Sequence, residues 1–187
     1  MNPTSQDLQL YFLALLPPGD LQAEITAIKQ EFAHCYHARH ALKSPPHLTL
    51  FPPFRWSLAQ QTQFNCLEQF TQQQSCIPID LDGFGAFAPR VIYIRPQPTP
   101  DLLALHAALQ RFLKEHLGLV DSLNQKRGFH PHITVAHRDL SRPAFHQAWP
   151  SFQGRSLHRQ FTATAITLLR HQGHRWEEVN EWSFQSS

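Results

Sequence analysis

Hydrophobic residues along the chain follow two different spacings, which predict strands and helices in alternation. The segment 8–16 is a short apolar run that ends at two prolines and a glycine, a combination typical of a buried strand. In the next segment Leu21, Ile25, Ile28 and Phe32 recur three or four residues apart, which places them on one face of an amphipathic helix. The chain is therefore expected to begin with a strand followed by a helix.

The same two spacings continue through the rest of the chain. A helix is predicted at 100–117, because Thr99 can cap it, Pro100 occupies its first turn and Gly118 ends it. Ser57 fits the start of a capping box, so another helix is expected to open there. The remaining predictions are a short helix at 142–149 and strands at 46–51, 76–81, 91–95, 130–136, 160–169 and 175–184. Helices set among antiparallel strands indicate an α+β fold, and without any low-complexity linker 1–187 is predicted to be a single domain.

Composition narrows the classes of protein that fit this pattern. Apolar residues make up 42% of the 187 positions, with fourteen Phe and four Trp, which excludes an intrinsically disordered chain. A net charge of +2 argues against nucleic-acid binding driven by bulk charge. Three cysteines without paired spacing argue against a disulfide framework or a thiolate zinc site. No apolar run approaches the length of a membrane span and the N-terminus does not read as a signal peptide, so we expect a cytoplasmic protein without membrane association.

The pattern Pro-His-aliphatic-Thr-aliphatic occurs twice, at 46–50 and 131–135, and both copies fall on predicted strands. Since alternate side chains of a strand share a face, His47 and Thr49 should point the same way. His132 and Thr134 should do so in the second copy. In a chain with 13 His one His-x-Thr says little, but two copies with the same flanks argue against chance. Internal repetition at this scale suggests two similar lobes that face each other.

These four side chains together suit the hydrolysis of a phosphodiester. Two imidazoles, one neutral and one protonated, can act as base and acid near neutral pH, each role contributing roughly 10²–10⁴ in rate. Two hydroxyls can donate hydrogen bonds to the non-bridging oxygens, where charge accumulates. This chemistry requires neither a metal nor a cofactor, so we expect none.

The paired motifs resemble those of the 2H phosphoesterase superfamily, most closely its RNA 2′,3′-cyclic phosphodiesterase branch, also called 2′-5′ RNA ligase. The resemblance rests on the segments 15–18, 47–50 and 129–135. It implies a bilobal fold with pseudo-twofold symmetry, in which two antiparallel sheets with outer helices flank a central cleft. It also implies that the two chain ends build one lobe and the middle of the chain builds the other.

The resemblance further implies roles for the motif residues. His47 and His132 would be the acid/base pair, and Thr49 and Thr134 would hold the phosphate. The implied reaction opens a 2′,3′-cyclic phosphate at an RNA terminus, or of a related cyclic nucleotide, to a 2′-phosphate. Some relatives also join RNA ends through a 2′-5′ linkage. We expect a monomer, and keep open ADP-ribose 1″,2″-cyclic phosphate or a 2′-5′ oligonucleotide as substrate, or a non-catalytic RNA-binding module.

Two departures from the RNA branch bear on the substrate. Relatives commonly continue the first motif with Phe-Leu-Gly, where this chain has Phe-Pro-Pro at 51–53. They often carry Arg five residues after the second His, where this chain has His137 followed by Arg138. If the strand continued, Arg138 would share the side of His132 and Thr134, so a contact between Arg138 and the phosphate is predicted.

Other residues near the motifs are weaker candidates for function. A metal site built from three spaced histidines is conceivable, although a solvated helix end explains them better; they are His34, His37 and His40. We expect His130 to line the site. Three aromatic residues are candidates for stacking on a base: Tyr11, Phe51 and Trp56. Basic residues that flank the motifs could attract a phosphate backbone: Arg39, Lys43, Arg55, Lys126 and Arg127.

Overall fold

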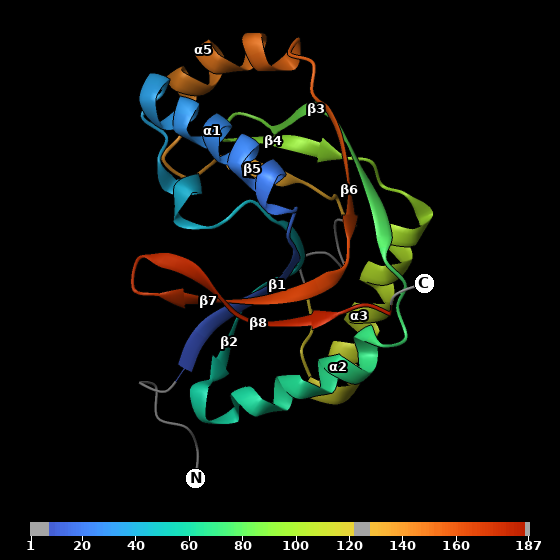
Figure 1. Cartoon of the computed structure of the whole chain (residues 1–187). Helices are drawn as coiled ribbons and strands as arrows, with labels where there is room; N and C mark the ends of the chain where they lie inside the picture. The colour runs from blue at the N-terminus through green and yellow to red at the C-terminus, as the bar shows by residue number, and fades with distance from the viewer. Residues whose placement is uncertain (1–7, 122–127, 186–187) are drawn as a thin grey trace.

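The structure, a computed structural model, describes residues 8–121 and 128–185 (Figure 1). Within these residues, eight strands form two four-stranded antiparallel sheets, ordered β2-β1-β7-β8 and β5-β4-β3-β6. The strands are β1 (Leu8–Leu15), β2 (Leu48–Ser57), β3 (Ile77–Phe87), β4 (Val91–Pro96), β5 (Ile133–Ala136), β6 (His158–Ala163), β7 (Ala165–Gln172) and β8 (Arg175–Ser183). The helices are α1 (Gly19–Cys35), α2 (Cys66–Thr71), α3 (Pro100–Leu117) and α5 (Arg142–Gln153), with 3₁₀ segments η1 (His40–Lys43) and η2 (Leu58–Asn65).

The two sheets are related by an approximate internal symmetry. The unit β1–α1–β2 in the first half corresponds to β4–α3–β5 in the second half, and in each unit the last strand lies at the edge of its sheet. The chain ends supply the first sheet and the middle of the chain supplies the second, with β6 added from the C-terminal part. The α+β class, the two antiparallel sheets and the symmetric arrangement expected from the sequence are therefore confirmed.

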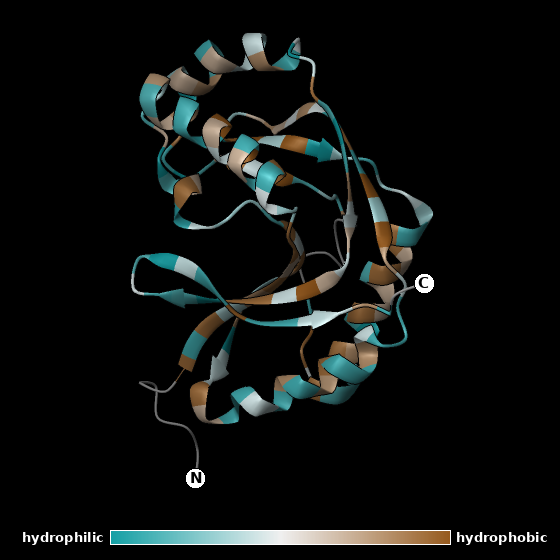
Figure 2. Ribbon diagram, viewed as in Figure 1, coloured by the Kyte–Doolittle hydropathy of each residue, from teal (hydrophilic) through white to brown (hydrophobic). Residues whose placement is uncertain are grey.

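Helices pack against both sheets, and α1 packs against the sheet to which its flanking strands β1 and β2 do not belong. The helix α1 packs against β5 and α5 packs against β3 and β4, whereas α2 contacts β8 and α3 contacts β2 and β3 (Figure 1). The predicted apolar face of α1 is buried in the core, and teal and brown bands alternate along the helices in Figure 2, as amphipathic helices require. Among the described residues, none of the helices has both the length and the apolar composition to cross a membrane.

Most predicted elements are present, although several differ in extent or type; the strands predicted at 46–51, 76–81 and 130–136 are β2, β3 and β5, with shifted ends. The helix predicted at 100–117 is α3, and the Thr99 side chain accepts a hydrogen bond from the Leu102 N–H as expected of its cap. The single strand predicted at 160–169 is two strands that break at Thr164, because β6 pairs with β3 and β7 pairs with β1 in the other sheet. Ser57 makes no side-chain cap, and the segment after it is a 3₁₀ helix before the short α2. The helix expected at 142–149 extends to Gln153.

Candidate functional site

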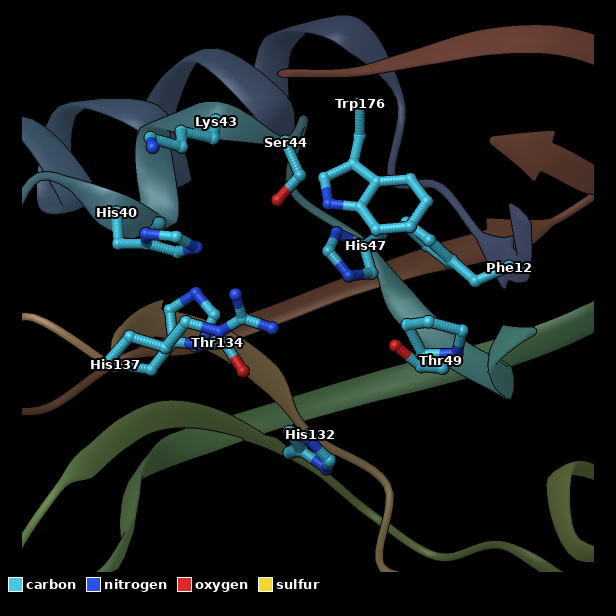
Figure 3. Close-up of a pocket in the computed structure, with 13 residues that line it drawn as sticks. Phe12, His40, Lys43, Ser44, His47, Thr49, His132, Thr134, His137 and Trp176 are labelled. Atoms are coloured by element: carbon cyan, nitrogen blue, oxygen red, sulfur yellow. The ribbon is translucent and has the colours of Figure 1, made fainter. Parts of the chain in front are cut away.

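The two motif segments meet at one cavity between the sheets. Each lies at an edge strand, with the histidine one residue before the strand and the threonine at its second position. His47, Thr49, His132 and Thr134 all line a cavity of about 200 Å³. In Figure 3 the two imidazoles lie on opposite sides of this space, with Thr49 and Thr134 between them on its two flanks. The arrangement puts two imidazole–hydroxyl pairs face to face.

A β-bulge follows the threonine in both motif strands. In β2, Thr49 pairs with Ala14 and Phe51 pairs with Leu13, which leaves Leu50 as the extra residue. In β5, Thr134 pairs with Tyr93 and Ala136 pairs with Ile92, which leaves Val135 in the equivalent position. Bulges are frequent beside active sites because they redirect the side chains that follow. Here each bulge ends the alternation that presents the motif side chains to the cavity.

Both motif imidazoles are oriented by the same backbone hydrogen bond. The Nδ1 of His47 lies 2.7 Å from the carbonyl oxygen of Pro45, and the Nδ1 of His132 lies 2.7 Å from the carbonyl oxygen of His130. Because a carbonyl oxygen only accepts, each Nδ1 must carry the proton and donate it. The Nε2 of each ring is therefore the nitrogen left for chemistry in the cavity.

Burial favours the neutral form of both rings. Removal from water lowers the pKa of His47 to about 3, against the opposing effect of the Pro45 carbonyl, and the positive charge of Lys29 lowers it further. Removal from water also lowers the pKa of His132, with the His130 carbonyl opposing. Both imidazoles are thus neutral at pH 7 when no anion is bound.

Helices from both halves support the motif segments. Lys29 of α1 is 1% exposed, and its Nζ donates to the carbonyl oxygen of Ser44, 3.0 Å away, just before the first motif. Burial lowers the pKa of Lys29 to about 7. From α3, the side-chain amide of Gln110 donates to the carbonyl oxygen of Leu50 at 3.1 Å, and the ring of His106 stacks on Phe129 at 3.8 Å. The bulge of the first motif and the residues before the second are therefore tied to one helix.

Arg138 lines the cavity, but a turn places it there rather than the continued strand that was predicted. The strand ends at Ala136, which is buried, so strand alternation does not extend to Arg138. Arg138 instead has a positive φ of 56°, in a tight turn closed by the Asp139 N–H and the His137 carbonyl oxygen at 2.7 Å. Such a conformation is costly for a residue other than glycine and is commonly kept at functional sites.

The aromatic residues predicted to stack on a base do not line the cavity. Tyr11 and Phe51 are buried in the core, and Trp56 packs on the core beside Phe64. The bulge at Leu50 explains the error for Phe51, because it turns Phe51 away from the side of His47. The aromatic residues that do line the cavity are Phe12 and Trp176, whose rings are 4.6 Å apart. Sequence reasoning missed both, since they come from β1 and β8, far from either motif.

The remaining candidates are dispersed. His34 and His37 are exposed and only His40 lines the cavity, so the three do not converge; among the described residues no group of His, Cys, Asp or Glu is placed to hold a metal. His130 is exposed and contributes its carbonyl oxygen rather than lining the cavity. Of the basic residues, Lys43 lines the cavity, while Arg39 and Arg55 are exposed outside the lining and Lys126 and Arg127 lie outside the described residues.

Comparison with known proteins agrees with this fold. A protein of Bacillus licheniformis, provisionally named a phosphoesterase, is 30% identical over 131 residues, which are 68% of this chain and 70% of that protein. The protein TT0787 of Thermus thermophilus superposes with a TM-score of 0.71 at 18% identity, over 96% of this chain and 99% of that one. E. coli LigT complexed with 3′-AMP superposes with a TM-score of 0.66 at 20% identity, over 95% and 99% of the two chains. A family model described as the 2′-5′ RNA ligase superfamily matches residues 17–175, and the chain belongs to this family of 2H phosphoesterases.

Proposed function

We propose that the protein is a metal-independent phosphodiesterase that opens 2′,3′-cyclic phosphates at RNA termini, or in related cyclic nucleotides, to 2′-phosphates. One observation carries the proposal: two imidazole–hydroxyl pairs face each other across one cavity, with each Nδ1 tied to a backbone carbonyl. No acidic side chain lines the cavity among the described residues, so the donor set suits an anion rather than a hard metal ion.

The reaction follows from that arrangement. With the cyclic phosphate between the rings, the Nε2 of one imidazole removes a proton from water as the water oxygen attacks phosphorus. The bond from phosphorus to the 3′ oxygen breaks, and the protonated Nε2 of the other imidazole gives its proton to that oxygen. Thr49 and Thr134 donate to the non-bridging oxygens, and Arg138 offsets their charge. With a 5′-hydroxyl in place of water as the attacking group, the same steps form a 2′-5′ linkage and leave a 3′-hydroxyl.

The first test is removal of each imidazole. His47→Ala and His132→Ala should each lower kcat for adenosine 2′,3′-cyclic phosphate by about 10²–10⁴, because each removes one proton-transfer role. His174→Ala is the matched control, since His174 is exposed beyond the cavity in the turn after β7. Product chromatography should identify the 2′-phosphate from the unchanged protein, with a bell-shaped pH profile and no effect of a chelator. Thermal unfolding at an unchanged Tm would show that both variants fold.

Two outcomes would contradict the proposal. Full activity in either single variant would show that the two imidazoles do not share the chemistry. RNA retention that survives loss of either histidine, without turnover by the unchanged protein, would indicate a non-catalytic RNA-binding module. If the protein is an enzyme, rates measured on a panel that includes ADP-ribose 1″,2″-cyclic phosphate and a 2′-5′-linked oligonucleotide identify which phosphodiester it hydrolyses.

A further inference from the structure

The cavity extends past the motif side chains to a group of hydrogen-bond donors that the proposed reaction does not use. This donor end consists of His40, Lys43, Ser44 and His137, all of which line the cavity. In Figure 3, His40, Lys43 and His137 lie on the side of the cavity away from Phe12 and Trp176. Ser44 is three residues before His47, so the donor end is continuous with the reaction centre.

The donor end is held together by contacts between the two halves of the chain. The carboxylate of Asp139, after β5, accepts hydrogen bonds from the backbone N–H groups of Arg39 and His40 at 2.8 and 2.9 Å. The rings of His40 and His137 pack edge to face with their centroids 4.9 Å apart. These contacts join η1 to the turn after β5. The donor end is therefore a built part of the site and not a chance grouping of surface residues.

The chemistry of the donor end suits an anion. Lys43 brings an ammonium group, Ser44 a hydroxyl and the two imidazoles ring N–H groups, while no described residue that lines the cavity is acidic. Removal from water and the charges of Arg138 and Lys43 lower the pKa of His40, with Asp139 opposing. Removal from water, His40 and Arg138 lower the pKa of His137 to about 4, again against Asp139. A bound anion would offset the positive charges of Lys43 and Arg138 beside these two rings.

We propose that the donor end is a second phosphate site, which takes a phosphate carried by the same nucleoside as the reacting phosphate. This proposal rests on the proposed function, because the motif residues must hold the first phosphate. Every internal nucleotide of RNA carries a phosphate on its 5′ oxygen, so an RNA terminus supplies both groups. The substrate class is therefore a cyclic phosphate terminus with a 5′-phosphate, favoured over a nucleoside cyclic phosphate that lacks one.

The test compares two stable product analogues by calorimetry, adenosine 2′-monophosphate and adenosine 2′,5′-bisphosphate. The unchanged protein should bind the bisphosphate at least about tenfold more tightly, an advantage that Lys43→Met should largely remove. Lys114→Met is the matched control, because it removes one exposed positive charge on α3, away from this cavity, and leaves the same net charge. Lys43 is exposed, so its replacement does not threaten the fold.

Each outcome is decisive for one of the two proposals. Equal affinity for the two ligands in the unchanged protein, or an advantage that persists in Lys43→Met, would overturn the second phosphate site. Turnover of adenosine 2′,3′-cyclic phosphate is measured beside the binding. Turnover without a bisphosphate advantage would reject the second site and keep the reaction, whereas the advantage without turnover would reject the reaction and keep the site.

Discussion

The first and second motifs hold their imidazoles in the same way but in different surroundings. In both, a proline precedes the histidine, a carbonyl two residues earlier accepts from Nδ1 at 2.7 Å, and a bulge follows the threonine. Behind His47 lie Phe12, with ring centroids 4.7 Å apart, and the buried Lys29. His132 packs instead against the rings of Phe87 and Tyr93.

This difference separates two rings that the repeat makes chemically equivalent. The charge of Lys29 lowers the pKa of His47, and among the described residues no buried lysine or arginine lies behind His132. A base must be neutral before the reaction and an acid must be protonated. We infer that His47 is the base and that His132 takes up the proton needed by the acid. The repeat thus places the two imidazoles in the same way, and the residues that surround each ring determine which acts as base and which as acid.

After the loss of an imidazole, the largest expected effect is on the two hydroxyls, which the repeat makes equivalent. Thr49→Val and Thr134→Val keep the side-chain shape but remove the donor to the phosphate oxygens. Each should lower kcat by about 10²–10³, the usual cost of losing one donor to a charged transition state. Steady-state kinetics with adenosine 2′,3′-cyclic phosphate measure both. A loss confined to one variant would show that a single hydroxyl carries the stabilisation.

The next effect concerns Lys29, the buried lysine of the first half. Its pKa falls from 10.5 in the unfolded chain to about 7 in the folded protein, so between these values the folded state has released a proton that the unfolded state keeps. Stability therefore falls as pH drops through this window and rises with pH across it, by at most about 1.4 kcal/mol per pH unit. Below this window the Lys29 titration no longer makes the free energy of unfolding depend on pH, because both states hold the proton.

Urea unfolding of the unchanged protein and Lys29→Met from pH 6 to 9 measures this dependence. The difference in the free energy of unfolding should be flat below pH 7 and then shift by about 2–3 kcal/mol in favour of the unchanged protein by pH 9. Lys114→Met, in which an exposed lysine is lost, should show no such slope. A flat difference for Lys29→Met would mean that Lys29 titrates as an exposed lysine does.

The flanking aromatic residues offer a smaller contrast between the halves. Trp176 lines the cavity, whereas Phe87 packs on His132 from outside the lining. Stacking of a base on an aromatic ring contributes about 1–3 kcal/mol. Trp176→Leu should therefore raise KM for a cyclic nucleotide about tenfold, and Phe87→Leu should change it less than about threefold. Equal effects of the two variants would place the base elsewhere.

The repeat and the hydrophobic spacing predicted much of this arrangement, because both are local properties of the sequence. The repeat predicts His47, Thr49, His132 and Thr134 as a set, and all four line one cavity in the structure. The bulge at Leu50 was not predictable, since it depends on how β2 pairs with β1.

Burial and long-range contacts account for the other failures. Lys29 is not among the residues predicted for the site, yet it is buried on α1 and donates to the Ser44 carbonyl oxygen, in the segment that leads to the first motif. Trp176 reaches the cavity only because β8 belongs to the same sheet as β2. The break at Thr164 separates strands of two different sheets, a property of topology that hydrophobic spacing does not encode.

The smallest expected effect is the number of protons taken up when a phosphate binds. It tests most directly which imidazole acts as base and which as acid. Since burial lowers the pKa of each motif imidazole, both are neutral at pH 7. A bound phosphate raises the pKa of a nearby imidazole, so binding should draw in a proton. Calorimetry of adenosine 2′-monophosphate binding in buffers with different ionisation enthalpies should show an uptake between zero and one proton, larger at pH 6 than at pH 8.

The two histidine variants then assign the site of uptake. His132→Gln should abolish the uptake, whereas His47→Gln should keep it, because Lys29 opposes a charge on His47. The reverse result would exchange the acid and the base while leaving the two-imidazole mechanism in place. Binding without any proton uptake in the unchanged protein would mean that no imidazole becomes charged beside the phosphate, and the site would then lack the acid that the leaving oxygen needs.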